Sequence, residues 1–150
     1  MTILDRLERD MKEAARARDS ARLGAIRFAR SELGNRRIEV GRELDESDVT
    51  DVLSRIAKRH RESIEQFAGA GRDDLVDRER AQLEVIEEYL PEKLTREELL
   101  SIIGEAIEET GASSMRDMGA VMKVVMPRVM GRAEGGEVKS LVQSRLGAGE

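Results

Sequence analysis

Hydrophobic residues recur along this chain at intervals of three or four positions, and no long segment alternates apolar and polar residues. A spacing of three or four places side chains on one face of an α-helix, whereas strict alternation is typical of a β-strand. The pattern therefore predicts an all-α protein with about seven helices.

Capping residues and glycines divide the N-terminal part into four predicted helices. Thr2 followed by Asp5 forms a capping pair for the first helix, and Asp19 and Ser20 can cap the second. Gly41 is expected to end the second helix, because glycine enters the left-handed conformation without a steric penalty.

The third and fourth helices have similar boundary signals. Asp45 or Ser47 begins the third helix, and the glycines within residues 69–71 end it. The fourth helix is expected over about residues 73–89, because the residue before Pro91 is driven away from helical geometry.

Three further helices are predicted in the C-terminal part. The segment 95–98 is a capping box for the fifth helix, and the segment 114–117 repeats the pattern for the sixth. Pro127 is expected to kink or end the sixth helix near Val124, since proline removes a backbone donor. A short last helix follows the glycines at 135–136.

The joint at residues 89–94 predicts two domains. Residues 1–90 would form a four-helix N-terminal domain, and residues 91–150 a three-helix C-terminal domain. The chain has 150 residues, of which 39% are hydrophobic, so a core is expected without disulfides or metals to support it.

Composition excludes several kinds of chemistry. The sequence has no cysteine and one histidine, which excludes disulfides, thiolate zinc sites, iron–sulfur clusters and two-histidine metal motifs. We therefore expect no metal and no cofactor. No apolar run approaches the ~20 residues that span a bilayer, and no apolar signal segment begins the chain, so a cytoplasmic protein without a membrane partner is expected.

The net charge of −5 is unevenly distributed. Residues 1–37 carry a net charge of +4, residues 38–112 carry −11, and residues 113–150 carry +2. A polyanion such as RNA would be repelled by the middle segment and tolerated at both ends. The alternative is an ordinary mixed-charge helical surface without a partner.

No catalytic residue is predicted. His60 lies between Ile56 and Ile64 on an apolar face, where a packed histidine is expected rather than a proton-transfer group. The acidic residues of segments 84–92 and 105–109 fit solvated helix surfaces. Phosphate-binding loops and nucleophile elbows are absent from the sequence.

Five of the seven methionines follow one another at intervals of three and four, and therefore share a helix face. They are Met115, Met118, Met122, Met126 and Met130. Such a face can fill the core between three short helices, which is the interpretation we favour, or serve an adaptor as an adaptable docking surface for another protein.

Cations and glycines of the C-terminal part form a candidate nucleic-acid site. The chain's aromatic residues all lie outside this part, so contacts with phosphates are expected rather than base stacking. The candidates are Arg116, Gly119, Lys123, Arg128, Gly131, Arg132, Gly135, Lys139 and Arg145, the glycines allowing close approach of the backbone.

Four segments resemble a known family. They are residues 67–75 (FAGAGRDDL), 87–94 (EEYLPEKL), 110–122 (TGASSMRDMGAVM) and 131–135 (GRAEG). Together they resemble the YqeY-like proteins over essentially the whole chain. The C-terminal part is similar to the tail domain of the B subunit of the glutamine-dependent aspartyl/glutamyl-tRNA amidotransferase.

The resemblance implies a two-part helical fold and a link to tRNA-dependent amidation, with tRNA or a tRNA-modifying or aminoacylating enzyme as partner. At family level it implies carbon–nitrogen ligase activity with glutamine as amide donor. Catalysis by this chain alone is not expected, because it lacks the domains that hydrolyse glutamine and activate the carboxylate. Glu134 and Ala120 depart from the usual Asp and Lys, and Ala120 removes a cation from the candidate site. The oligomeric state stays open.

Overall fold

The computed structural model describes residues 1–148, and these contain helices and no strand. Seven α-helices and one 3₁₀ turn follow in order: α1 (Ile3–Ala17), α2 (Ser20–Val40), α3 (Glu46–Gly69), α4 (Asp73–Glu87), α5 (Arg96–Thr110), η1 (Met115–Asp117), α6 (Met118–Val129) and α7 (Gly135–Ala148). The predicted all-α class and the helix count are confirmed for the described residues.

The helix ends form largely as local capping rules predict. Thr2 and Asp5 make a reciprocal capping box at α1, and Asp45 does the same with Asp48 at α3. Asp19 accepts from the Arg22 amide at the start of α2. At α5 only half of the predicted box forms, because Thr95 accepts from the Glu98 amide without a return bond.

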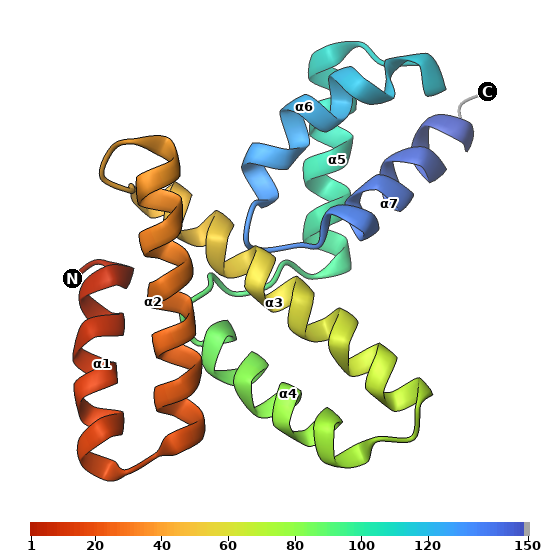
Figure 1. The fold of residues 1–150 in the computed structure, drawn as a ribbon. Coiled ribbons are helices and arrows are strands. Elements are labelled where there is room, and N and C mark those ends of the chain that lie inside the picture. Colours follow the sequence, from red (N-terminus) through yellow and green to blue (C-terminus); the bar gives the residue numbers. More distant parts are fainter. Residues whose placement is uncertain (149–150) are drawn as a thin grey trace. The chain divides into compact units, whose positions relative to one another are not determined.

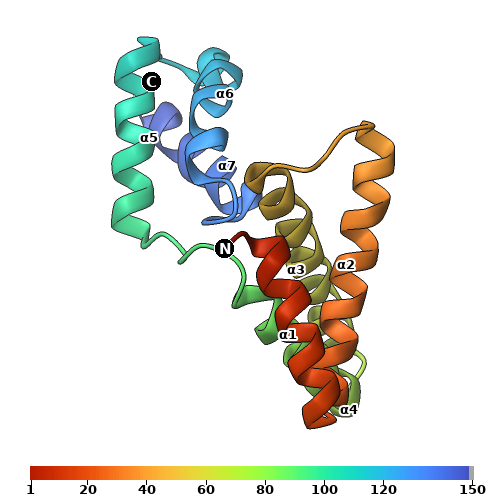
Figure 2. The same ribbon diagram turned by 90° about the vertical axis from the view of Figure 1, so that its left-hand side faces the viewer.

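The chain divides into two compact units, and the first comprises Met1–Pro91. Within it α1 lies beside α2, and α3 lies beside α4, in both views (Figures 1 and 2). Their apolar faces meet in one core. Its largest fully buried side chains are Leu7, Ile26, Val49, Leu53, Ile56 and Ile86.

The second unit begins at Glu92 and holds α5, α6 and α7, which pack on one another (Figure 1). Its core is separate from that of the first unit. The fully buried side chains there include Leu99, Ile103, Val121, Val125, Val129, Val138 and Val142. Each unit thus has a hydrophobic core of its own.

The expected end of α6 near Val124 is wrong, whereas the favoured interpretation of the methionines as core filler holds for the three that pack against the core. The helix continues to Val129 and includes Pro127, rather than ending near Val124. Proline costs the final turn one backbone hydrogen bond, and the full burial of Val125 and Val129 holds that turn in place. The centre of the core contains these valines and Val121, whereas the methionines lie beside them.

The five methionines of η1, α6 and the residue after α6 are half-buried or exposed. Met118, Met122 and Met126 pack against the core from its edge, and Met115 and Met130 are 38% and 37% exposed. On a straight helix the valines and the methionines occupy neighbouring strips, and the valine strip faces α5 and α7.

No described helix is both long enough and apolar enough to cross a membrane.

Candidate functional site

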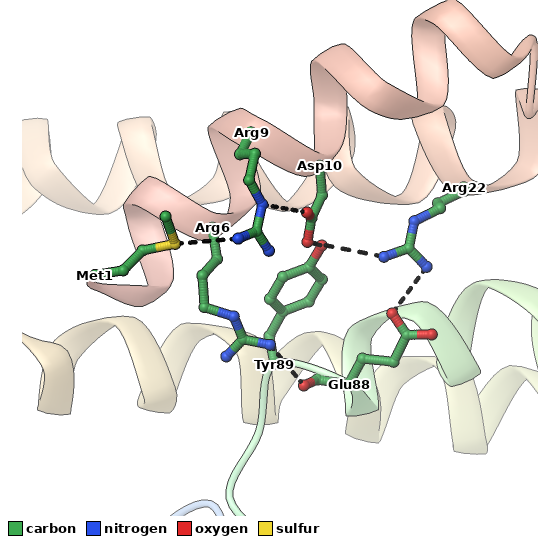
Figure 3. Close-up of polar contacts among 7 residues, drawn as sticks. All are labelled: Met1, Arg6, Arg9, Asp10, Arg22, Glu88 and Tyr89. Atoms are coloured by element: carbon green, nitrogen blue, oxygen red, sulfur yellow. Dashed lines mark hydrogen bonds and ion pairs between the residues drawn. The ribbon is translucent and has the colours of Figure 1, made fainter.

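A polar cluster surrounds the buried Tyr89 where the first unit ends (Figure 3). Tyr89 is 2% exposed, and its hydroxyl donates to Asp10 Oδ2 at 2.5 Å. Arg9 Nε donates to the other oxygen of Asp10 at 3.0 Å. Arg22 approaches Asp10 at 3.8 Å and forms a 2.8 Å ion pair with Glu88. The cluster therefore joins α1, α2 and the segment after α4.

Arg6 completes this cluster from the other side of the ring. Its guanidinium carbon lies 5.1 Å from the centroid of Tyr89, within the range of a cation–π contact. Its Nη2 donates to the Glu88 carbonyl at 3.3 Å. The tyrosine is thus held at its ring, at its hydroxyl and through the neighbouring peptide (Figure 3).

The two acidic groups of the cluster have opposite pKa shifts. Burial alone would raise the pKa of Asp10, but the hydrogen bonds from Tyr89 and Arg9 outweigh it, so this pKa lies below its usual value. Burial, and then the bond to Asp10, raise the pKa of the Tyr89 hydroxyl well above its usual value. At neutral pH the tyrosine is protonated and the aspartate is charged.

This protonation pattern makes the cluster a structural element. A general acid or base needs a pKa near the working pH and an atom free to reach a substrate. The Tyr89 and Asp10 pKa values are shifted apart, away from neutrality. Among the described residues, no buried side-chain nitrogen or oxygen lacks a hydrogen-bond partner. The cluster fixes the chain at the point where it leaves the first unit.

His60 is a packed histidine, as predicted. Its Nδ1 lies 2.6 Å from Glu79 Oε2, and the two side chains are 12% and 23% exposed. The pair links α3 to α4. No described hydrogen bond joins His60 to a serine or threonine hydroxyl.

Nowhere among the described residues do three histidine, cysteine, aspartate or glutamate side chains gather in a way that could hold a metal ion.

The cations predicted to bind nucleic acid fall into two groups. Arg116, Lys123, Lys139 and Arg145 are exposed and form no ion pair with another described residue. They come from three elements, η1, α6 and α7. The guanidinium of Arg145 lies over Gly104 of α5, where an added Cβ would be 3.6 Å from its Nη2.

The other two cations are engaged within their own unit. Arg128 forms a 2.7 Å ion pair with Glu109 of α5, which lowers the pKa of that carboxyl. Arg132 Nε donates to the Glu92 carbonyl at 3.0 Å, and the Arg132 carbonyl accepts from the Leu94 amide at 2.8 Å. These bonds attach the start of the second unit to the turn after α6.

The predicted glycines have different surroundings. Gly119 is exposed, and a Cβ added there would meet nothing within 4 Å. Gly131 has a φ of 76°, a conformation that favours glycine, in the turn after α6. Gly135 begins α7 close to Met126, whose Cε would lie 3.9 Å from an added Cβ. Of the three, Gly119 lies on the open surface beside Lys123.

Sequence reasoning missed the Tyr89 cluster, although one signal was present. Asp10 lies between Leu7 and Ala14 on the apolar face of the first helix, where an acidic residue must find a partner to be buried. The partner, 79 residues away, cannot be identified from spacing alone.

Comparisons with known proteins agree with the resemblance noted from the sequence. The family model described as "Yqey-like protein" matches residues 4–146. A relative from Pyrenophora tritici-repentis, named "Altered inheritance of mitochondria protein 41, mitochondrial", is 33% identical over 97% of this chain and 82% of its own length.

Proteins of the same name from two yeasts match shorter regions. The relative from Lachancea thermotolerans is 38% identical over 56% of this chain and 46% of its own length. The one from Saccharomyces cerevisiae strain S288c is 32% identical over 62% of this chain and 51% of its own length. Because the family model covers nearly the whole chain, this protein belongs to the YqeY-like family.

Proposed function

We propose that this chain is a non-catalytic module whose second unit binds the phosphate backbone of tRNA, as an accessory to tRNA-dependent amidation. The observation that carries the proposal is the composition of α6. Within Met118–Val129 there are two cations and no carboxylate, and Lys123 is exposed beside the open Gly119. A phosphate can approach this face without meeting a negative side chain of α6.

The cations differ in the contacts within the protein that each would have to break in order to bind a phosphate. Lys123 forms no ion pair with a described residue, so a phosphate there would displace only water and counterions. Arg116 also forms no ion pair with a described residue, although its charge acts on the neighbouring Asp117 carboxylate. Arg128 would first have to leave Glu109. Arg132 would have to give up the Glu92 carbonyl. We therefore assign the main phosphate contacts to Arg116 and Lys123, with Lys139 as a further candidate.

The acidic helix of the same unit sets a limit on the binding surface. The exposed residues of α5 include Glu97, Glu98, Glu105, Glu108 and Glu109, with Arg96 as the sole exposed cation of that helix. Phosphates are repelled by such a surface. In the proposed complex the RNA lies along α6 and away from the exposed side of α5.

The resemblance to the amidotransferase tail domain supports tRNA as the ligand and suggests where the chemistry resides. Two polar side chains of the first unit that could serve chemistry are bonded to carboxylates, Tyr89 to Asp10 and His60 to Glu79. In this proposal the carbon–nitrogen ligase activity of the family belongs to an enzyme that this chain accompanies. The chain itself supplies binding.

A titration of labelled bulk tRNA at low salt, followed by fluorescence anisotropy, tests the binding. Lys123→Glu combined with Arg116→Glu should weaken binding by about tenfold or more and flatten its salt dependence. Arg96→Glu is the control within the same unit, because it reverses a cation already surrounded by acidic residues. An unbound wild-type chain, or equal weakening by the control, would contradict the proposal.

The non-catalytic part of the proposal has its own test. The purified chain is incubated with glutamine, ATP and mischarged tRNA, and amidated product is measured. We expect no turnover until the amidotransferase subunits are added. Turnover by the chain alone would overturn this part while leaving the binding result intact.

A protein-docking adaptor is the second candidate, favoured by the partly exposed methionines. Met115 and Met130 are 38% and 37% exposed, so replacing them perturbs the core less than replacing Met118 or Met122. Met115→Asp with Met130→Asp should abolish co-purification of a protein partner if this face is a docking surface. Circular dichroism must first show that the variant is folded.

A further inference from the structure

The outward face of α2 differs from the other long exposed helix faces of the first unit. Between Gly24 and Ile38 the exposed positions are Gly24, Arg27, Phe28, Arg30, Ser31, Gly34, Asn35, Arg37 and Ile38. Three of these nine residues are arginines and none is acidic. By contrast, the exposed positions of α4 are Asp73, Asp74, Asp77, Arg78, Arg80 and Glu84.

The one acidic residue of this stretch of α2, Glu32, is engaged by a cation of α3. Glu32 is half-buried and forms a 3.3 Å ion pair with Arg59 of α3. Glu39, one position beyond the stretch, is exposed and pairs with Arg36 at 3.1 Å. On the side of α2 that faces α3, the carboxylate of Glu32 is therefore paired and does not offset the positive charge of the outward face.

The arginines of this face are available to a ligand. Arg27 forms no ion pair with a described residue, and the one described contact of the Arg30 guanidinium is with the sulfur of Met11. Arg37 pairs with Glu43 at 3.0 Å, but both side chains are largely exposed, so solvent screens this pair. From Arg27 to Arg37 the helix rises about 15 Å, enough to follow several phosphates of one strand.

We infer that the outward face of α2 is a second contact for the phosphate backbone of RNA, an inference that rests on the proposed function of RNA binding. Ser31 and Asn35 add hydrogen-bond donors between the arginines. A Cβ added at Gly24 or Gly34 would meet nothing within 4 Å, so a strand can lie close to the helix backbone there.

Phe28 fits RNA better than it fits a protein partner. Its ring is 44% exposed, and the guanidinium of Arg59 lies 5.6 Å from its centroid. An aromatic ring among arginines can stack on an unpaired base. The other large apolar residue of this face, Ile38, is ten positions further along the helix, about 15 Å away. Two separated apolar side chains do not form the continuous patch of a protein-docking surface.

A charge-reversal pair on α2 tests the inference on the full-length chain. Arg27→Glu with Arg30→Glu is titrated with labelled bulk tRNA over a range of salt concentrations. We expect about a tenfold or greater loss of affinity at low salt and a smaller slope of log affinity against log salt. Arg27→Glu with Arg37→Glu is a second pair, which leaves the Arg30–Met11 contact in place.

The matched control is Arg78→Glu with Arg80→Glu on α4. It changes the net charge by the same amount in the same unit, but among acidic residues. Affinity should change much less in this control than in the α2 variants. The thermal unfolding midpoint of every variant is compared with that of the wild type, so that a folding defect is not taken for lost binding.

The outcomes separate this inference from the proposed function. If Lys123→Glu with Arg116→Glu loses affinity while the α2 and α4 variants bind tRNA as tightly as the wild type, the α2 contact is refuted and the proposed function stands. If the α2 variants lose affinity and Lys123→Glu with Arg116→Glu does not, the α2 contact stands and the assignment of the main contacts to Arg116 and Lys123 fails. If wild-type protein does not bind tRNA, both fail.

Discussion

At the scale of single residues, the Tyr89–Asp10 pair is the contact on which the first unit depends most. Both side chains are almost completely buried, and three elements meet at their hydrogen bond. Removing one partner leaves the other without its hydrogen bond, and water cannot replace that bond at a buried site. The consequences can be measured both at neutral pH and as a function of pH.

Tyr89→Phe should lower the free energy of unfolding by about 1–3 kcal/mol at pH 7, because Asp10 loses a hydrogen-bond donor in a buried site. Urea denaturation measures this change. A double-mutant cycle with Asp10→Asn isolates the pair, and a coupling energy near zero would contradict the assigned role.

The pH dependence of stability should flatten in Tyr89→Phe. In the wild type the lowered pKa of Asp10 gives stability that is present above its usual value of 3.8 and is lost as the pH falls. The raised pKa of Tyr89 gives stability that is present below its usual value of 10.0 and is lost as the pH rises. The variant has no hydroxyl to ionise and a less depressed Asp10 pKa, so denaturation series at both extremes should show smaller losses.

At the scale of helices, local signals predicted the ends of most elements, and packing decided the rest. Thr2, Asp19 and Asp45 cap helices as expected, because a cap depends on residues within one turn. The end of α6 depends instead on the burial of Val129, which no local rule contains. The positions of the candidate cations likewise depend on which carboxylates of α5 come within reach.

The contributions of individual α6 side chains to stability can be compared by replacing each with alanine. Val129→Ala should cost about 2 kcal/mol of unfolding free energy, because the side chain is fully buried and leaves a cavity. Met126→Ala removes more atoms but should cost less, about 1 kcal/mol, since that methionine is only half-buried at the edge of the core.

Urea denaturation of the two single variants decides between these assignments. A larger loss for Met126→Ala would show that the methionines, rather than the valines, form the centre of this core. Val124→Ala, at a half-buried position of the same helix, is the control for the general effect of shortening a valine.

At the scale of the whole chain, two cores imply two units of stability. The first core draws on α1–α4 and the second on α5–α7, and each has its own set of fully buried side chains. Sequence predicted two parts from the proline-containing joint, but it could not supply the Arg132 bonds that attach residues 92–94 to the turn after α6. Those bonds belong entirely to the second unit.

We therefore expect a core mutation to destabilise its own unit selectively. Ile56→Ala should increase amide hydrogen exchange throughout α1–α4, and Val125→Ala throughout α5–α7, because each leaves a cavity in one core. Hydrogen exchange followed by mass spectrometry resolves the two sets of peptides in the full chain. Equal acceleration of both sets by either mutation would mean that the chain unfolds as one cooperative unit. Selective acceleration would mean that RNA-binding variants in one unit can be interpreted without correcting for the stability of the other.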